Sequence, residues 1–202
     1  MNILTMPQRS PEWFDARKGK ISGTRFGQAI STRKNKLIYE LLAEQLSDYV
    51  FPDDYISDDM QFGIDNEPVA RELYSKQSGI DWREVGMIQS EIIQINTASP
   101  DGLSPDNSIV LEIKCTRNLD VHLQRFFEGI ESQYMNQIMN YFVVADEVKQ
   151  VHFVSYCPAS ETKPLIVYVF EREHYIDLIN ESREKLRAIE EKLNKMIVEY
   201  LF

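Results

Sequence analysis

The stretch A-S-P-D-G-L-S-P-D-N-S-I-V-L-E-I-K-C-T, residues 98 to 116, decides how this chain is expected to fold. Its second part, Ile109 to Thr116, is rich in β-branched and apolar residues, which predicts a β-strand. Two Pro-Asp turn signals precede that strand. A hairpin at Ser104 to Ser108 would therefore bring Asp101 beside the strand, at the centre of a sheet.

The predicted strand would carry two charged side chains on one face. Residues two apart in a strand point the same way, so Glu112 and Lys114 should stand side by side. The alternate residues are expected to point into the core: Leu111, Ile113 and Cys115. With Asp101 beside Glu112, two carboxylates and an ammonium would meet at a sheet edge, a combination that suits a hard divalent cation and a phosphate.

Length and composition indicate one globular unit. The chain has 202 residues and 43% hydrophobic content, enough for one well-cored domain over residues 1–202. The N-terminus has no basic region followed by an apolar run, and no segment has the apolar length that a membrane span needs, so a cytoplasmic protein is expected. Its two cysteines, Cys115 and Cys157, lie in strand-like apolar sequence. Buried thiols are favoured over a disulfide framework or a zinc site, and the count excludes a cysteine-ligated cluster.

The charge of the chain is unevenly distributed. The net charge of −10 would by itself argue against a nucleic-acid partner. Residues 1–36, however, hold eight basic side chains against two acidic ones, a local balance of +6 that leaves −16 for the rest. One end of the chain could therefore hold a polyanion while metal ions offset acids elsewhere; a solvated basic face is the alternative.

The basic N-terminal segment contains two helix-start signals. Ser10-Pro11-Glu12 predicts a helix that ends near Gly19, and Ser22-Gly23-Thr24 predicts a second, short helix through Ile30. A helix N-terminus beside Arg17 and Lys20 would be an anion site, suited to a phosphate. Ordinary helix capping explains the same pattern without a ligand.

Two further helices are predicted before the hairpin. Apolar spacing predicts an amphipathic helix over Asn35 to Val50, then a loop over Phe51 to Ser57, then a helix over Met60 to Gly79. Pro68 should kink that helix or start it, which would hold Glu67 at a break, although such a glutamate is more often a solvated surface residue. One side of the helix is expected to be apolar: Val69, Leu73 and Tyr74.

The second half of the chain alternates strands and helices. One or two strands are predicted over Val85 to Thr97, a short helix over Leu119 to Ile130, and a clear helix over Ser132 to Ala145. That last helix presents four residues on one face: Tyr134, Gln137, Ile138 and Tyr141. If this face abuts the carboxylates, Tyr134 and Gln137 can donate hydrogen bonds to a phosphate or a water; otherwise they satisfy each other.

The C-terminal third is predicted to be a hairpin followed by a long helix. Strands are expected at Lys149 to Cys157 and Leu165 to Phe170, and a charged helix over Glu171 to Phe202. Its predicted buried stripe is Ile176, Ile179, Leu186, Ile189, Leu193 and Ile197. The mixture of elements indicates an α/β or α+β fold, with a central mixed sheet flanked by helices.

The motifs together resemble one nuclease family. In this sequence Gly63-x-x-x-Glu67 precedes Ser99-Pro100-Asp101-Gly102-Leu103, then Leu111-Glu112-Ile113-Lys114-Cys115, then Tyr134-Met135-x-Gln137. This order and spacing resemble the YqaJ-like, lambda-exonuclease-type branch of the PD-(D/E)XK nucleases. Trp13-x-x-x-Arg17-x-Gly19-x-Ile21-Ser22-x-Thr24 is similar to the N-terminal segment of that family, and V-x-V-F-E-R-E, residues 167 to 173, is similar to its C-terminal strand and helix. The resemblance therefore covers essentially the whole chain.

The resemblance implies a restriction-endonuclease-like core and a 5′-to-3′ exonuclease on double-stranded DNA that leaves 3′ single strands for phage-type recombination. It also implies a homotrimeric ring, a single-strand annealing protein as partner, and Mg²⁺, or Mn²⁺, as cofactor, with two ions bound. Asp101, Glu112 and the carbonyl of Ile113 are the implied metal ligands, and Lys114 is the implied catalytic lysine.

The resemblance also assigns the surrounding residues. Glu67 would lie near the second metal, and Tyr134 and Gln137 would line the site. The implied 5′-phosphate pocket consists of Arg17, Thr24 and Ser22, with Lys20 in the same basic segment.

Two other functions are compatible with the same residues. An endonuclease with this core would cut closed circular DNA, whereas an exonuclease needs an end. A DNA-end-binding module or assembly subunit without catalysis would retain DNA binding but show no metal-dependent turnover.

Overall fold

The computed structural model describes residues 1–47 and 57–202. The loop predicted at 51–56 and the end of the helix predicted to reach Val50 lie outside the described residues.

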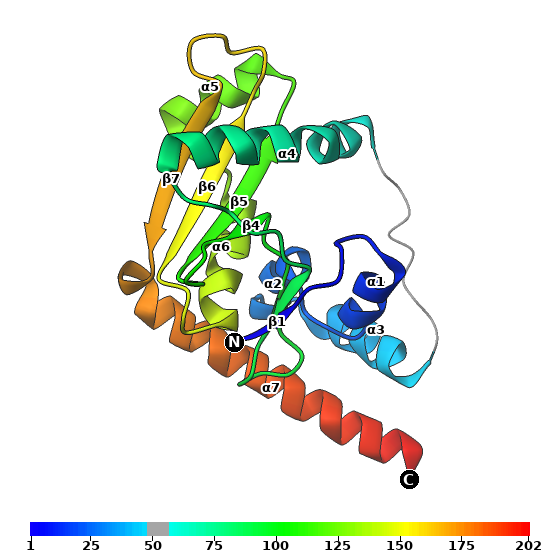
Figure 1. Ribbon diagram of the computed structural model, residues 1–202. Coiled ribbons are helices and arrows are strands. Elements are labelled where there is room, and N and C mark those ends of the chain that lie inside the picture. The colour runs from blue at the N-terminus through cyan, green and yellow to red at the C-terminus, as the bar shows by residue number, and fades with distance from the viewer. Residues whose placement is uncertain (48–56) are drawn as a thin grey trace.

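The predicted hairpin strand lies inside a four-stranded mixed sheet. Strand β5 (Ile109–Cys115) pairs antiparallel with β4 (Gly102–Leu103) and parallel with β6 (Gln150–Tyr156), and β6 pairs antiparallel with β7 (Leu165–Glu171). The sheet order is therefore β4-β5-β6-β7 (Figure 1). The turn at Ser104 to Ser108 is where it was predicted, and the hairpin β6–β7 is confirmed as well.

A second, smaller sheet was predicted only in part. It has the order β1-β2-β3 and consists of β1 (Asn2–Leu4), β2 (Met87–Gln89) and β3 (Thr97–Ala98). One or two strands were expected between Val85 and Thr97, and two are present, the second of which extends to Ala98, but β1 was missed. A three-residue strand has too few positions for alternation to be seen, and its partner β2 lies more than 80 residues away along the chain.

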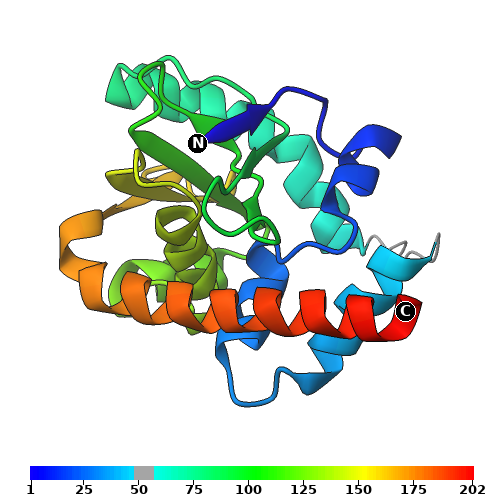
Figure 2. The same ribbon diagram turned by 90° about the horizontal axis from the view of Figure 1, so that it is seen from below.

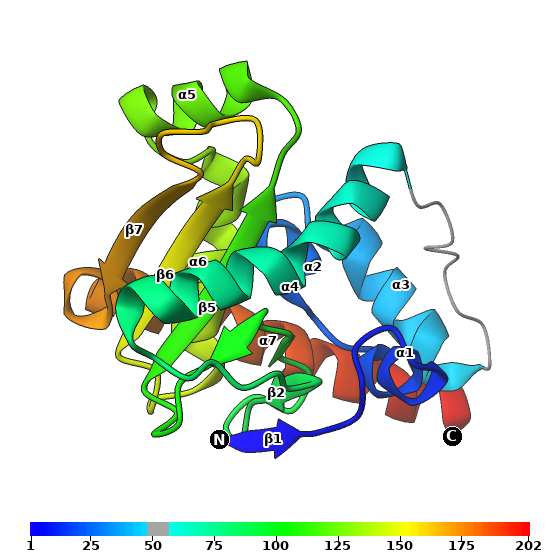
Figure 3. The ribbon, with the colours of Figure 1, turned by 45° about the horizontal axis from the view of Figure 1, so that its top comes forward.

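Helices cover both faces of the four-stranded sheet. Helix α4 (Asp58–Ser78) crosses the face that presents Leu111 and Ile113, packing Ala70 and Tyr74 against them. Helix α6 (Ser132–Val144) lies on the other face (Figure 3), where Phe142 joins the larger core with Val110. Strand β5 is therefore covered on both sides, which explains why even Glu112 is buried.

Helix α4 corrects two predictions. It runs without interruption through Pro68, so Glu67 does not lie at a break. Proline removes one intrahelical hydrogen bond, but the Ser57 side chain caps the helix start by accepting from the Met60 N–H, and the packed residues hold the helix beyond. The predicted apolar side is also wrong, because Val69 and Leu73 are 45% and 36% exposed while Tyr74 is buried.

The other helices agree with the predictions to within a few residues. They are α1 (Pro11–Arg17), α2 (Gly23–Ile30), α3 (Asn35–Leu46), α5 (Leu119–Glu128) and α7 (Ile176–Leu201). Ser10 caps α1 through its hydroxyl, as its position before Pro11 predicts.

The long helix α7 packs along α2, α3 and α6 (Figure 2). A short 3-10 turn (Arg172–Tyr175) precedes it. Ile176 is therefore the first residue of the helix, and it is 45% exposed although it was predicted to be buried. Four other residues of the predicted stripe are buried: Ile179, Leu186, Ile189 and Leu193. Glu181 and Lys185 form an ion pair of 2.7 Å on its surface.

Cys157 is a buried free thiol, as predicted, whereas Cys115, also predicted to be buried, is a free thiol that is only partly buried. Within residues 1–47 and 57–202, no helix has the length and apolar content required to cross a membrane.

Candidate functional site

The hairpin folds Asp101 back onto the middle of β5. The N–H of Ile113 donates a 2.5 Å hydrogen bond to Asp101 Oδ2, and the N–H of Asp101 donates to the carbonyl of Leu111. Strand β4 pairs only with Val110 and Leu111, so it does not extend alongside Ile113. The edge of β5 at Ile113 therefore faces the Asp101 side chain in place of a neighbouring strand.

Glu112 and Lys114 lie on the face of β5 that α6 covers. Glu112 is 2% exposed; one of its carboxylate oxygens forms an ion pair with Lys114, and the other accepts a hydrogen bond from the Tyr141 hydroxyl. The Lys114 Nζ lies 5.3 Å from the centre of the Tyr134 ring. The face predicted for α6 thus contacts Glu112 through Tyr141 and Lys114 through Tyr134.

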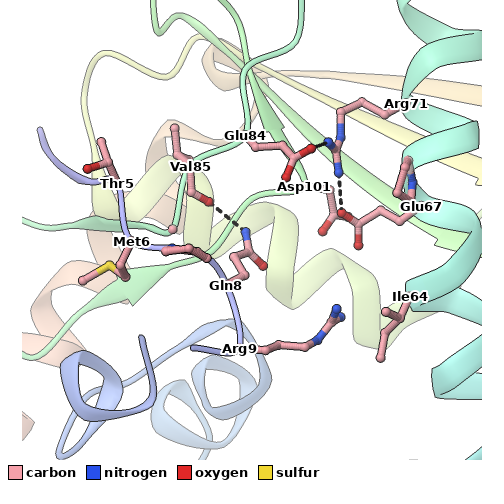
Figure 4. A pocket seen from close by; sticks show the side chains of 13 residues that line it. Thr5, Met6, Gln8, Arg9, Ile64, Glu67, Arg71, Glu84, Val85 and Asp101 are labelled. Atoms are coloured by element: carbon pink, nitrogen blue, oxygen red, sulfur yellow. Dashed lines mark hydrogen bonds and ion pairs between the residues drawn. The ribbon is translucent and has the colours of Figure 1, made fainter. Parts of the chain in front are cut away.

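Glu67 reaches the same place from the opposite face of the sheet. It projects from α4 and accepts a 2.7 Å hydrogen bond from Arg71, which also pairs with Glu84. Glu67 and Asp101 line one pocket of about 460 Å³, with their carboxylates side by side (Figure 4). The three carboxylates therefore converge on the open edge of β5 from three different elements.

This convergence perturbs the protonation of the groups. Burial raises the pKa of Asp101 well above its ordinary value, and the charges of Glu112 and Glu67 raise it further. Burial acts to lower the pKa of Lys114, but the carboxylates of Glu112 and Asp101 outweigh it and raise that pKa. Burial, followed by Glu112, raises the pKa of the Tyr141 hydroxyl well above its ordinary value, so that it stays a donor. Three carboxylates thus share the site with two cationic side chains, Lys114 and Arg71.

A divalent cation fits this donor set. The available ligands are hard carboxylate oxygens and, at the edge that β4 leaves open, the carbonyl of Ile113, which suit Mg²⁺ or Mn²⁺. Among the described residues, no three His, Cys, Asp or Glu side chains are grouped as a ready-made metal cage. Each acid is instead engaged by a protein donor: Asp101 by Ile113, Glu112 by Lys114 and Tyr141, and Glu67 by Arg71. A bound divalent cation would displace some of these donors from the carboxylate oxygens.

A second polar cluster lies where α1 ends and α2 begins. Arg17 donates a 2.9 Å hydrogen bond to the Ser22 hydroxyl, which lies 3.3 Å from the Thr24 hydroxyl. The guanidinium of Arg17 lies over the Trp13 ring, at 4.1 Å from its centre. Trp13 in turn donates to Ser99, two residues before Asp101. The structure therefore brings together Arg17, Ser22 and Thr24 and ties them to the hairpin.

Gln137 and Lys20 lie in different surroundings. The Gln137 side chain packs on the first turn of α2: a Cβ built at Gly23 would lie 3.5 Å from its amide nitrogen. Gln137 thus lies on the same face of α6 as Tyr141, one helical turn before it, and faces the start of α2. Lys20 instead donates to the carbonyl of Gln94, and burial lowers its pKa while Glu190 acts to raise it.

Two site residues were not assigned a role from the sequence. Tyr141 was placed on the correct face of α6 but not singled out, although its position seven residues after Tyr134 puts both on the face that contacts Glu112 and Lys114. Arg71 lies one helical turn after Glu67, a spacing that could have predicted the ion pair.

Comparison with known proteins gives a family and a fold. The family model of the YqaJ-like viral recombinase domain matches residues 12–147. The chain belongs to this family. A search of curated proteins finds no match. The fold of this YqaJ-like chain matches that of an alkaline exonuclease, LHK-Exo, from Laribacter hongkongensis, with a TM-score of 0.79 and 28% identity over 95% of this chain and 96% of that chain.

Two other solved structures are similar. LHK-Exo in complex with dAMP matches with a TM-score of 0.77 and 27% identity, over 95% of this chain and 98% of that chain. A phage-related exonuclease from Haemophilus somnus 129PT matches with a TM-score of 0.64 and 15% identity, over 90% and 96% of the two chains, which shows the fold alone. The predicted nuclease fold and the resemblance to the YqaJ-like family are therefore confirmed.

Proposed function

We propose that this protein is a Mg²⁺-dependent 5′-to-3′ exonuclease that digests linear double-stranded DNA and leaves 3′ single-stranded overhangs for phage-type recombination. The coarser statement, a phage-type DNA exonuclease, follows from membership in the YqaJ-like family and the likeness to alkaline exonuclease over nearly the whole chain. The observation that carries the proposal is the convergence of Asp101, Glu112 and Lys114 at the open edge of β5.

The site residues have two proposed roles, metal binding and stabilisation of the reacting phosphate. Asp101, Glu112 and the Ile113 carbonyl would hold one ion, and Glu67 would help to hold a second one directly or through water. A bound Mg²⁺ would lower the pKa of a water and offset negative charge on the phosphate. The ammonium of Lys114, which the carboxylates of Glu112 and Asp101 keep charged in spite of its burial, can orient the attacking water and stabilise the charge that develops on the phosphate oxygens.

The cluster of Arg17, Ser22 and Thr24 is proposed to bind the 5′-terminal phosphate. A guanidinium and two hydroxyls at a helix start offer several donors to one phosphate. Gln137 lies next to this helix start and can donate to the same group. The complex of LHK-Exo with dAMP shows a deoxynucleoside monophosphate bound to a protein of this fold, which supports a nucleotide-sized site.

Replacing Arg17 with alanine is expected to reduce the preference for 5′-phosphorylated over 5′-hydroxyl ends. A hydrogen bond to a charged group contributes roughly 1.5–3 kcal/mol, so the preference should fall about 10- to 100-fold. The measurement is the ratio of initial digestion rates on the two duplexes, which cancels any general loss of activity. Arg33→Ala, an exposed change in the same basic segment, is the control; an Arg17→Ala ratio equal to wild type would exclude Arg17 from the pocket.

The resemblance to the family also leads us to propose a homotrimeric ring around DNA and a single-strand annealing protein as partner. A ring would confine DNA contacts to one surface, which is compatible with a chain whose net charge is −10 but whose first 36 residues are basic. DNA binding by that surface should weaken steeply with salt.

One assay tests the proposed activity. Linear duplexes labelled at the 5′ or the 3′ end are incubated beside a closed circle, with Mg²⁺ or with chelator. The proposal predicts early release of 5′ label, an intact circle and no digestion in chelator. Cutting of the circle would instead identify an endonuclease, and DNA binding without metal-dependent digestion would identify an end-binding subunit.

A further inference from the structure

The segment before α1 places a second arginine beside the carboxylates. Arg9 lines the pocket that Glu67 and Asp101 share, and its side chain extends toward α4 below their carboxylates (Figure 4). Within residues 1–47 and 57–202, its guanidinium has no hydrogen bond or ion pair to the protein, unlike Arg71 on the other side of the pocket.

The backbone of Arg9 is in a conformation that arginine rarely adopts. Its φ is +65°, in the left-handed region, where glycine is free and asparagine is tolerated. The other non-glycine residue with positive φ in the described chain is Asn107, of the type expected in a turn. A strained arginine at a pocket is therefore unusual, and such residues cluster at functional sites.

The surrounding contacts fix this conformation. The side-chain amide of Gln8 donates to the carbonyls of Val85 and Pro100, the residue before Asp101. The Ser10 N–H donates to the carbonyl of Pro7, and the Ser10 hydroxyl caps α1. Arg9 is thus held between two anchored neighbours, at a fixed place relative to Asp101.

We propose that Arg9 binds a phosphate of the DNA backbone next to the carboxylate site and positions the strand there. The inference rests on the proposed nuclease function and extends it, because Arg9 does not belong to the Arg17 cluster. An unpaired guanidinium in a pocket is well suited to a phosphate.

The test compares Arg9→Gly, Arg9→Lys and the control Arg187→Ala, a change of an exposed arginine on α7 outside the basic N-terminal segment. Binding to a linear duplex is measured in the Asp101→Asn background across a range of salt concentrations, and steady-state digestion is measured in the wild-type background. Arg9→Gly should bind about tenfold more weakly, with a salt slope lower by about 0.9 in magnitude, the value for one lost phosphate contact. Its KM should rise while kcat changes little.

Two further readouts separate positioning from a structural role. Arg9→Gly should melt at the same temperature as wild type or higher, because glycine accepts the positive φ. Arg9→Lys should keep the wild-type salt slope, because it keeps the charge. The control Arg187→Ala should change neither KM nor the melting temperature.

Specific results would overturn the inference. The role of Arg9 is excluded if Arg9→Gly has unchanged affinity and salt slope, or if its melting temperature falls. Digestion of linear duplex by the wild-type protein would still support the proposed function in that case. A wild-type protein that neither binds nor digests duplex DNA would overturn both.

Discussion

Replacing Asp101 with asparagine is expected to reduce Mg²⁺-dependent digestion of linear duplex DNA by about 10³-fold. Asparagine keeps an oxygen for the Ile113 N–H but loses the charge that would hold the ion. Loss of a metal ligand removes several kcal/mol of charge stabilisation, and about 1.4 kcal/mol corresponds to a factor of ten. The measurement is the single-turnover digestion rate at saturating enzyme, so that a change in DNA affinity does not contribute.

The fold of this variant should remain intact. Burial and the neighbouring acids already raise the pKa of Asp101, so a neutral side chain relieves repulsion and the melting temperature in chelator should not fall. Lys114→Ala should lose activity similarly, but it also leaves the buried Glu112 without its cation, so its stability has to be measured beside its rate. Wild-type digestion by a folded Asp101→Asn protein would remove Asp101 from the site.

The largest expected effect on stability comes from Arg25→Met. Arg25, on α2, forms two hydrogen bonds with Glu44 of α3, whose side chain is 4% exposed. Breaking a buried ion pair from one side costs about 3–5 kcal/mol, and we expect about 2–3 kcal/mol here because Arg25 is 25% exposed and the Gly19 N–H also donates to Glu44. Urea unfolding at pH 7 measures the change, with Arg33→Met as the exposed control.

The same pair predicts a pH dependence. Burial acts to raise the pKa of Glu44, but hydrogen bonds from Arg25 and Gly19 outweigh it, so the pKa lies below its ordinary value of 4.5. A lowered carboxyl pKa contributes stability that is complete above the unfolded value and is lost as pH falls through the folded value. The difference between wild type and Arg25→Met should therefore shrink below about pH 4.5. A difference that stays constant down to pH 3 would argue against the pair as its cause.

Local patterns predicted the parts of the site that lie close together in the sequence. The turn before β5 and the alternation along it placed Asp101, Glu112 and Lys114 on one hairpin, because strand periodicity and turn chemistry act over a few residues. The Ser10 cap and the face of α6 were predictable for the same reason. The family resemblance then supplied roles that the spacing alone could not.

Features that depend on tertiary packing were not predictable. Pro68 was expected to interrupt α4, yet packing of Ala70 and Tyr74 on the sheet keeps the helix continuous. Strand β1 and the approach of Gln8 to Pro100 join residues more than 80 positions apart. The positive φ of Arg9 has no local sequence signal either, since glycine or asparagine would be expected there.

The most direct test of the account is the position of a bound metal ion. Crystals grown with Mn²⁺ and measured at a wavelength where manganese scatters anomalously would locate it. We expect anomalous density within about 2.0–2.6 Å of oxygens from Asp101, Glu112 and the Ile113 carbonyl, with the Asp101 carboxylate turned away from the Ile113 N–H. At saturating Mn²⁺, density elsewhere, or none while Asp101 still accepts from Ile113, would contradict the assignment of this hairpin as the catalytic centre.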